Sequence, residues 1–242
     1  MKGKIIISLF ITLIISNNSY ATSSFKDIDE GNKNYNSVNL IVNKYKVMSG
    51  FPDGTFKGEE NITRYTYSTI MLNTIEILNK KMNEIEEKNI YDTNQSVLND
   101  IKISNIPDFN KEHWAYESAT TLLKIGLIKT FSDNTFRGEQ KVDCLGFSIG
   151  LGRIMNIIYN SAPPVLKRKW EKENKKITSI NGIAKDSPIF EPLKMAIENN
   201  LTDNKDLKEM MKPITRYEVA EYLIRLIDKL EEVRKYIVFT KI

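Results

Sequence analysis

The sequence has 242 residues, of which 41% are hydrophobic and 27% charged, and its formal net charge is +4. These ordinary fractions favour a globular protein of one or two domains over a disordered chain. The charge is too low to indicate a nucleic-acid-binding protein, and it suits an anionic wall polymer as partner. Cys144 is the only cysteine, so a disulfide within the chain is excluded.

The first residues have the pattern of an export signal. Lys2 and Lys4 precede an uncharged run from Ile5 to Ile15, and Ser19-Tyr20-Ala21 offers small residues to signal peptidase. This run falls short of the roughly 20 residues that cross a bilayer as a helix, which disfavours the alternative of an uncleaved anchor. We therefore expect residues 1–21 to be a signal peptide and the mature chain to be exported. No later run is apolar for long enough to predict a membrane span.

A short unit recurs along the rest of the chain. Residues 51–59 (FPDGTFKGE) align with residues 131–139 (FSDNTFRGE) at an offset of 80. The tetrapeptide Ile62-Thr63-Arg64-Tyr65 returns as Ile214-Thr215-Arg216-Tyr217, and each copy opens a long segment with helical apolar periodicity. A repeated unit of this kind is more typical of a binding protein than of an enzyme.

Each unit is predicted to form a short helix, a loop and a longer helix. Apolar residues at helical spacing mark the short helices, and they are Val38, Ile41, Val42 and Tyr45; then Ala115, Ala119, Leu122 and Leu123; then Phe190, Leu193 and Ile197. The Asp53-Gly54 pair predicts a tight turn, in which Asn134 replaces the glycine of the second copy because asparagine tolerates positive φ. Residues 203–211 have neither Gly nor Thr-Phe, so the third loop must be built differently.

The long helices are predicted from their caps and apolar stripes. Thr215 and Glu218 have the spacing of a capping box, and Thr63 can cap its helix in the same way. The clearest stripe comprises Val219, Leu223, Leu226, Ile227, Leu230 and Val233. Three glycines weaken the second long helix, which suggests that another backbone packs closely there; they are Gly146, Gly150 and Gly152.

Arg64 and Arg216 stand at the start of a helix, where the helix dipole disfavours a cation. One explanation is a salt bridge to a carboxylate of a neighbouring unit. The other is an anion site, because a guanidinium and free N–H groups at a helix start both favour a carboxylate or phosphate. Both readings remain open at this point.

These motifs together resemble the S-layer homology module. The resemblance rests on His113-Trp114-Ala115, residues 53–56, the two Ile-Thr-Arg-Tyr segments and the short entry segments 25–28, 106–109 and 183–186. It implies a mainly α fold of three helix-loop-helix modules in a pseudo-threefold arrangement. The expected boundaries are module 1 at 22–82, a polar linker at 83–105, a degenerate module 2 at 106–159, a basic linker at 160–182, module 3 at 183–235 and a C-terminal tail at 236–242.

The resemblance also implies a ligand, namely cell-wall polysaccharide attached to peptidoglycan and commonly pyruvylated, held in grooves between modules. Arg64 and Arg216 would pair with its carboxylate, while Thr63, Thr215 and the Asp53-Gly54 turn would shape the grooves. Trp114 would line a groove, although packing into the core is an equally good reading. Asp143-Cys144 replaces Thr-Arg in module 2, so that groove is expected to be silent or to bind something else.

We therefore predict a non-catalytic protein of the cell envelope, in the periplasm or at the surface, that binds this wall polymer without a cofactor or metal. The alternative is an envelope scaffolding protein whose degenerate modules contact other proteins. An enzyme is the weakest hypothesis, because His113 and Cys144 occupy unrelated positions and no metal-ligand spacing or nucleophile motif occurs.

Overall fold

The computed structural model describes residues 25–86, 103–174, 176–203 and 206–240. The predicted signal peptide at 1–21 lies outside these ranges, as does most of the predicted polar linker. The helices are α1 (Tyr35–Asn39), the π-helix η1 (Leu40–Lys44), α2 (Arg64–Glu86), the 3-10 helix η3 (Ile103–Asn105), α4 (Tyr116–Lys124), α5 (Cys144–Ser161), α6 (Pro164–Glu173), α7 (Phe190–Glu198), α8 (Leu207–Met210) and α9 (Arg216–Thr240). The mainly helical fold expected from the sequence is confirmed.

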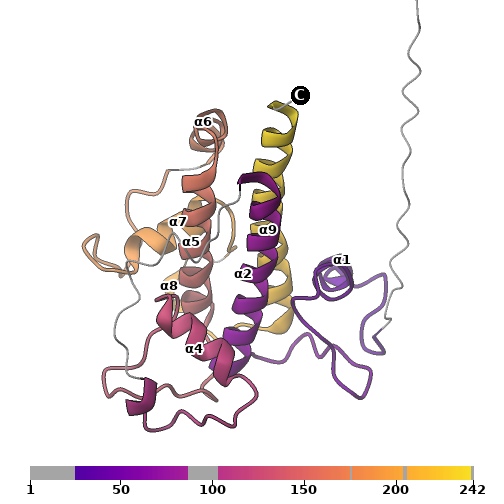
Figure 1. The fold of residues 1–242 in the computed structure, drawn as a ribbon, viewed down its shortest axis with the longest axis vertical. Helices are drawn as coiled ribbons and strands as arrows, with labels where there is room; N and C mark the ends of the chain where they lie inside the picture. The colour runs from indigo at the N-terminus through magenta and orange to yellow at the C-terminus, as the bar shows by residue number, and fades with distance from the viewer. Residues whose placement is uncertain (1–24, 87–102, 175, 204–205, 241–242) are drawn as a thin grey trace, which may run out of the picture.

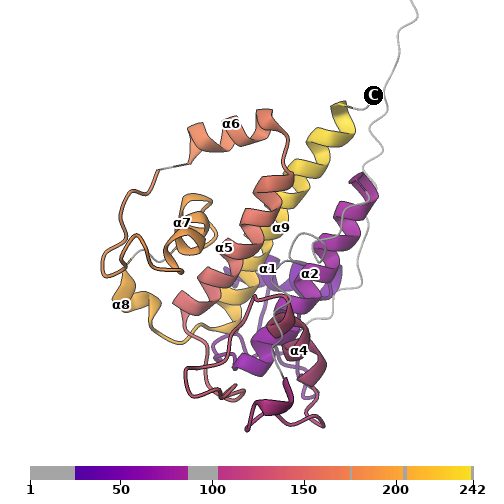
Figure 2. The ribbon, with the colours of Figure 1, turned by 60° about the vertical axis from the view of Figure 1, so that its left-hand side comes forward.

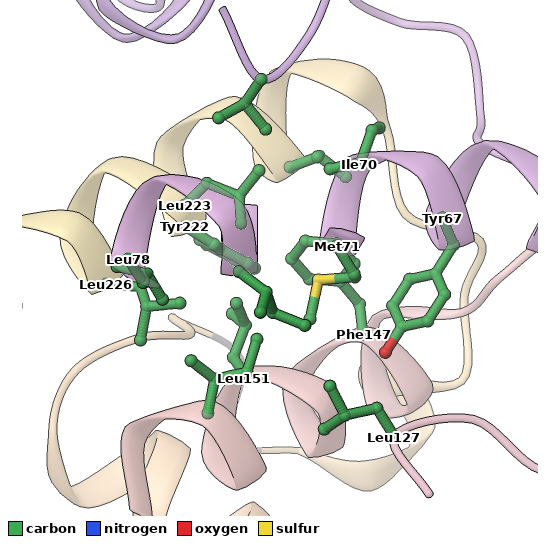
Figure 3. Close-up of a cluster of buried hydrophobic side chains, with 14 of the residues drawn as sticks. Tyr67, Ile70, Met71, Leu78, Leu127, Phe147, Leu151, Tyr222, Leu223 and Leu226 are labelled. Atoms are coloured by element: carbon green, nitrogen blue, oxygen red, sulfur yellow. The ribbon is translucent and has the colours of Figure 1, made fainter. Parts of the chain in front are cut away.

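The long helices α2, α5 and α9 run side by side through the molecule, one from each predicted module (Figure 1; Figure 2). Their buried side chains meet in one core, where Met71 of α2, Phe147 of α5 and Leu223 of α9 face one another (Figure 3). The apolar stripes read from the sequence therefore point inward. A smaller cluster is centred on Phe190, Leu193 and Met210 of the third module, and Leu145 and Ile149 of α5 pack against it.

The short helices cross from one module to the next. Helix α4 of module 2 packs on α2 of module 1, α7 of module 3 packs on α5 of module 2, and α1 of module 1 packs on α9 of module 3. The modules thus contact one another in a closed cycle. Gly152 of α5 allows the closest of these approaches, since a β-carbon there would overlap the backbone of Pro192 in α7. The close packing predicted from the glycines is confirmed at this position.

A ring of backbone hydrogen bonds joins the segments that precede the three long helices. The N–H of Ile62 donates to Ile214 O at 3.4 Å, that of Ile214 to Val142 O at 2.9 Å, and that of Val142 to Ile62 O at 3.0 Å. Isolated antiparallel bridges, Asn61–Thr215, Thr63–Lys141 and Asp143–Pro213, accompany these bonds. The ring brings the starts of α2, α5 and α9 together.

In each of the first two modules, an aspartate of the entry segment holds the loop through hydrogen bonds to its backbone. Asp27 accepts hydrogen bonds from the N–H groups of Phe56 and Lys57, at 2.8 and 2.7 Å. Asp108 accepts the equivalent bonds from Phe136 and Arg137, both at 2.7 Å. The first two modules therefore repeat each other in detail as well as in outline.

The loops of modules 1 and 2 form the predicted tight turns. Gly54 and Asn134 both have positive φ, at 82° and 63°, which explains why asparagine replaces glycine in the second copy. The third loop is built differently, as expected, because the short helix α8 takes the place of the turn.

Two segments predicted to lie between or beyond the modules are helical. The segment predicted as a basic linker, residues 160–182, contains α6, in which Leu166 and Trp170 are buried against the core. The predicted tail continues α9, and Ile237 is buried in the core. The described part of the tail therefore docks on the core.

Candidate functional site: two grooves between modules

Arg216 reaches from the start of α9 into the loop of module 1. Its Nε donates to Phe56 O at 2.8 Å and its Nη2 to Ser49 O at 2.7 Å. The guanidinium also lies over the rings of Phe51 and Phe56, 4.8 and 4.5 Å from their centroids. The residue is only 8% exposed, so the protein holds this cation in one fixed position.

Arg64 makes the same set of contacts with the loop of module 2. Its Nε donates to Phe136 O at 2.7 Å and its Nη2 to Lys129 O at 2.8 Å, while the guanidinium lies over Phe131 and Phe136. Every partner is displaced by 80 positions from its counterpart at Arg216. Arg216 thus ties module 3 to module 1, and Arg64 ties module 1 to module 2.

The salt-bridge alternative for these arginines is wrong within the described residues, where no ion pair to either side chain is found within 4.0 Å. Burial lowers the pKa of both guanidinium groups. Arginine nevertheless stays protonated in proteins, so both groups carry their charge at neutral pH. Each therefore presents a partly desolvated positive charge whose bonds are to neutral carbonyl groups.

Each arginine lines a groove. The Arg216 groove has a volume of about 180 Å³ and is lined by Lys46, Val47, Met48, Ser49, Thr66, Thr69, Ile70, Asn73, Trp114 and Arg216. The Arg64 groove has a volume of about 220 Å³ and is lined by Arg64, Tyr67, Leu127, Ile128, Lys129, Val142, Gly146, Ile149, Arg153 and Ile189. All three predicted modules contribute to each groove, and neither lining contains a carboxylate.

Trp114 is 66% exposed and lines the Arg216 groove. The alternative that it packs into the core is therefore wrong. Its neighbour His113 instead packs inward, with its ring stacked on that of Tyr65 at a centroid distance of 3.6 Å.

The other predicted site residues shape the loops and helix starts without lining either groove. Thr215 and Glu218 form the predicted capping box, in which the Thr215 N–H donates to Glu218 Oε2 at 2.8 Å and the Glu218 N–H to Thr215 Oγ1 at 3.3 Å. Thr63 accepts from the N–H of Thr66 at 3.3 Å.

Asp53 closes its own turn, because its Oδ1 accepts from both the N–H and the hydroxyl of Thr55. These hydrogen bonds lower the pKa of the Asp53 carboxyl. Gly54 follows it at positive φ. The prediction that the Asp53-Gly54 turn contacts the ligand remains untested, but its role in the loop is clear.

The third helix start has no arginine. Cys144 occupies the position of Arg64 and Arg216, buried with its sulfur 3.8 Å from Thr202 Oγ1 and 3.9 Å from Ser148 Oγ. Burial raises the pKa of this thiol, so it carries no charge at neutral pH. Asp143 caps α5 by accepting from the N–H of Gly146 at 2.7 Å. This position therefore lacks the cation that the other two share.

Sequence reasoning missed a second set of equivalent residues, Asn73, Arg153 and Arg225. Asn73 donates to Val47 O at 3.1 Å, Arg153 to Leu127 O at 2.8 Å and Arg225 to Asn200 O at 3.2 Å. The offset of 152 between Arg64 and Arg216 and the offset of 80 between the first two loops also align these three positions. Extending the alignment along the long helices would have found them.

Comparison with known proteins agrees with this architecture. The model of the S-layer homology domain matches residues 24–64 and 105–143, which contain the entry segments, short helices and loops of the first two modules. The chain carries S-layer homology domains. The third predicted module lies outside both matched regions.

Curated relatives of these S-layer homology domains occur in surface proteins. The chain is 35% identical over 98 residues to cell surface glycoprotein 1 and 28% identical over 119 residues to a cellulosome-anchoring protein, both of Acetivibrio thermocellus. It is 27% identical over 82 residues to outer membrane protein SlpA of Thermus thermophilus. The matches cover 40, 49 and 34% of this chain but only 4, 23 and 9% of the relatives.

These matches support a role at the cell surface or cell wall. Within the described residues, no group of three or more His, Cys, Asp or Glu side chains could hold a metal ion. None of the helices there is long and apolar enough to cross a membrane.

Proposed function

We propose that this chain is a non-catalytic, exported envelope protein that binds acidic polysaccharide attached to peptidoglycan, pyruvylated polymers included, in the grooves at Arg64 and Arg216. The protein acts in the periplasm or at the cell surface, associated with the wall. The relatives' anchoring and surface roles support the general role, and the grooves supply its chemistry.

The observation that carries the proposal is a fixed cation in each groove with no carboxylate in the lining. Each guanidinium donates hydrogen bonds from Nε and Nη2 to backbone carbonyls, and no hydrogen bond from its Nη1 to another described residue is found. A cation held in place by the fold loses little conformational entropy when an anion binds, which favours affinity. A sugar carboxylate is therefore a suitable ligand.

The Arg216 groove adds a surface for the sugar itself. Trp114 presents an exposed indole beside Asn73 and Thr69. The Thr69 hydroxyl is buried and has no hydrogen-bond partner among the described residues. An indole that covers the apolar face of a pyranose, next to polar groups that meet its hydroxyls, is the general design of a carbohydrate site.

Purified sacculi test the proposal. The mature protein is sedimented with sacculi before and after mild acid removes the secondary polymer. We expect binding to intact sacculi that falls strongly after stripping. Equal binding to both preparations would contradict a polymer-directed site and favour the scaffolding alternative, in which a protein partner mediates attachment.

A further inference from the structure

The two grooves are built from equivalent positions but differ in charge and aromatic content. Asn73 of the Arg216 groove is replaced by Arg153 in the Arg64 groove, and the following module contributes Trp114 to the first groove and Ile189 to the second. The lining of the Arg64 groove includes three cationic residues, Arg64, Lys129 and Arg153, against Lys46 and Arg216 in the other. The two grooves therefore suit different ligand groups.

Arg153 performs the structural task of Asn73 and adds a charge. Its Nη1 donates to Leu127 O at 2.8 Å, as the Asn73 amide donates to Val47 O at 3.1 Å. The equivalent Arg225 is paired with Asp203 at 2.7 Å and with Glu221 at 2.6 Å. No such carboxylate pairs with Arg153 within the described residues. An amide would suffice to hold the loop, so the charge of Arg153 is available for another purpose.

Tyr67 supplies a polar group between these cations. It lines the Arg64 groove, is only 4% exposed, and interacts electrostatically with both Arg64 and Arg153. Its side chain reaches from α2 toward α5 (Figure 3), where the hydroxyl lies against Gly150. No hydrogen bond of this hydroxyl is found in the described part of the chain. The equivalent position in module 3 is Val219, which has no hydroxyl and does not line the Arg216 groove.

A neighbouring cavity enlarges the Arg64 groove. It has a volume of about 350 Å³ and shares Leu127 and Arg153 with that groove, so Arg153 lies at the junction of the two. The carboxylate in its lining, Glu191, is paired with Lys194 at 3.2 Å. A ligand bound at Arg64 and Arg153 therefore has room to continue along α5 and α7.

We propose, on the basis of the proposed wall-binding function, that the Arg64 groove binds a phosphate ester of the wall polymer, held by Arg64, Arg153 and Tyr67. The Arg216 groove binds a singly charged, carboxylated sugar against Trp114. Two guanidinium groups and a hydroxyl donor match the charge and the several acceptor oxygens of a phosphate ester. One guanidinium and an indole match a carboxylated pyranose.

Titration with two monosaccharides, followed by NMR of the isotope-labelled mature protein, tests this assignment. We expect glucose 6-phosphate to shift the amides of residues 127–129 and 146–153, and glucuronate to shift those of residues 47–49 and 69–73. Inorganic phosphate, titrated separately, shows how much of the affinity the sugar contributes. Shifts in the same groove for both sugars would overturn the assignment.

Three variants sharpen the test. R153N copies the residue of the other groove and is expected to weaken glucose 6-phosphate binding about tenfold, and Y67F several-fold, because each removes a donor to a charged group. R153K should retain part of the glucose 6-phosphate affinity, and it replaces R153N in the test if R153N does not fold. W114A is the matched control, and it should weaken glucuronate alone. Unchanged phosphate affinity in folded R153N and Y67F would overturn the assignment.

Sacculus binding is measured separately, so that the two proposals can fail independently. Phosphate binding that depends on Arg153, without sacculus binding, would support this site and contradict the wall-binding function. Sacculus binding with glucose 6-phosphate affinity independent of Arg153 would support the function and overturn the phosphate assignment.

Discussion

Arg64 and Arg216 each hold two carbonyl groups of the neighbouring module, so these residues serve the fold as well as the proposed site. Replacement by alanine would leave the carbonyl of buried Phe136 or Phe56 unsatisfied, at a cost of about 1–3 kcal/mol. Loss of binding in such a variant would then be ambiguous. Glutamine and lysine are better replacements, because both retain a donor and lysine also retains the charge.

Gly58 and Gly138 show why the loop motif contains Phe-Lys-Gly-Glu and Phe-Arg-Gly-Glu. A β-carbon at Gly58 would overlap the ring of Tyr217, and one at Gly138 the ring of Tyr65. We expect G58A and G138A each to destabilise the protein by about 1–3 kcal/mol in urea unfolding, because the tyrosine must move. G31A is the control, since its β-carbon meets only an Asp29 oxygen. Wild-type stability in G58A and G138A would contradict these contacts.

Two buried tyrosines predict a loss of stability at high pH. Burial raises the pKa of both Tyr67 and Tyr222 from 10.0 to about 12. Between these values the unfolded chain loses protons that the folded protein retains. Their contribution is therefore complete below pH 10 and is lost as the pH rises toward 12.

Urea unfolding from pH 8 to 11.5 checks this expectation, with Y67F as the comparison. The free energy of unfolding should fall more steeply with pH in the wild type than in Y67F. Parallel pH profiles for the two proteins would show that the Tyr67 hydroxyl titrates normally in the folded state.

At the scale of elements, the charged residues of α6 concealed from sequence analysis that this helix packs on the core. Its lysines and arginine suggested a solvated linker, yet Leu166 and Trp170 are four positions apart and face the core. Trp170 is 1% exposed, and its Nε1 donates to Glu232 of α9 at 2.8 Å. Two apolar residues at helical spacing in a ten-residue segment are a weak signal, and Pro164 at the first helical position is a further one.

We predict that W170A costs about 3–5 kcal/mol, because a large buried ring is removed. The same variant should expose the basic residues of α6 to trypsin, and limited proteolysis measures this. W170F, which keeps a ring, is the control, and its stability should lie between those of the wild type and W170A. A trypsin-resistant and fully stable W170A would mean that α6 does not contribute to the fold.

The long helices and turns could be predicted because their signals are local. Thr215 and Glu218 cap a helix within three residues, and the stripe from Val219 to Val233 needs no other segment to be recognised. The π-helix at residues 40–44 could not be predicted, because its apolar residues have a spacing that an ordinary α-helix would fit equally well.

At the scale of the molecule, the ring of hydrogen bonds through Ile62, Val142 and Ile214 links segments as far apart as 152 positions. Because each segment bonds to the other two, opening one should disturb all three. We predict that these three amides exchange with solvent at similar free energies, close to that of global unfolding, in native-state hydrogen exchange. Exchange of one of them at a far lower free energy would show that its module opens alone.

The candidate site could be predicted only in part, because it is formed by segments that are far apart in the sequence. Arg64 and Arg216 were identified from a repeated tetrapeptide, but each lines a groove formed largely by the following module in the cycle. Local patterns do not show which modules pack together. That Tyr67 and Arg153 line one groove follows only when α2 and α5 are placed side by side.

The proposed function depends on the binding of an acidic wall polymer by the two groove arginines. Its most direct test is the sedimentation of wild type, R64Q, R216Q and the double variant with intact sacculi, after each protein is shown to be folded. We predict weaker binding for each single variant, near-complete loss for R64Q/R216Q, and partial retention for R64K/R216K. A folded R64Q/R216Q protein that binds sacculi as well as the wild type would contradict the account.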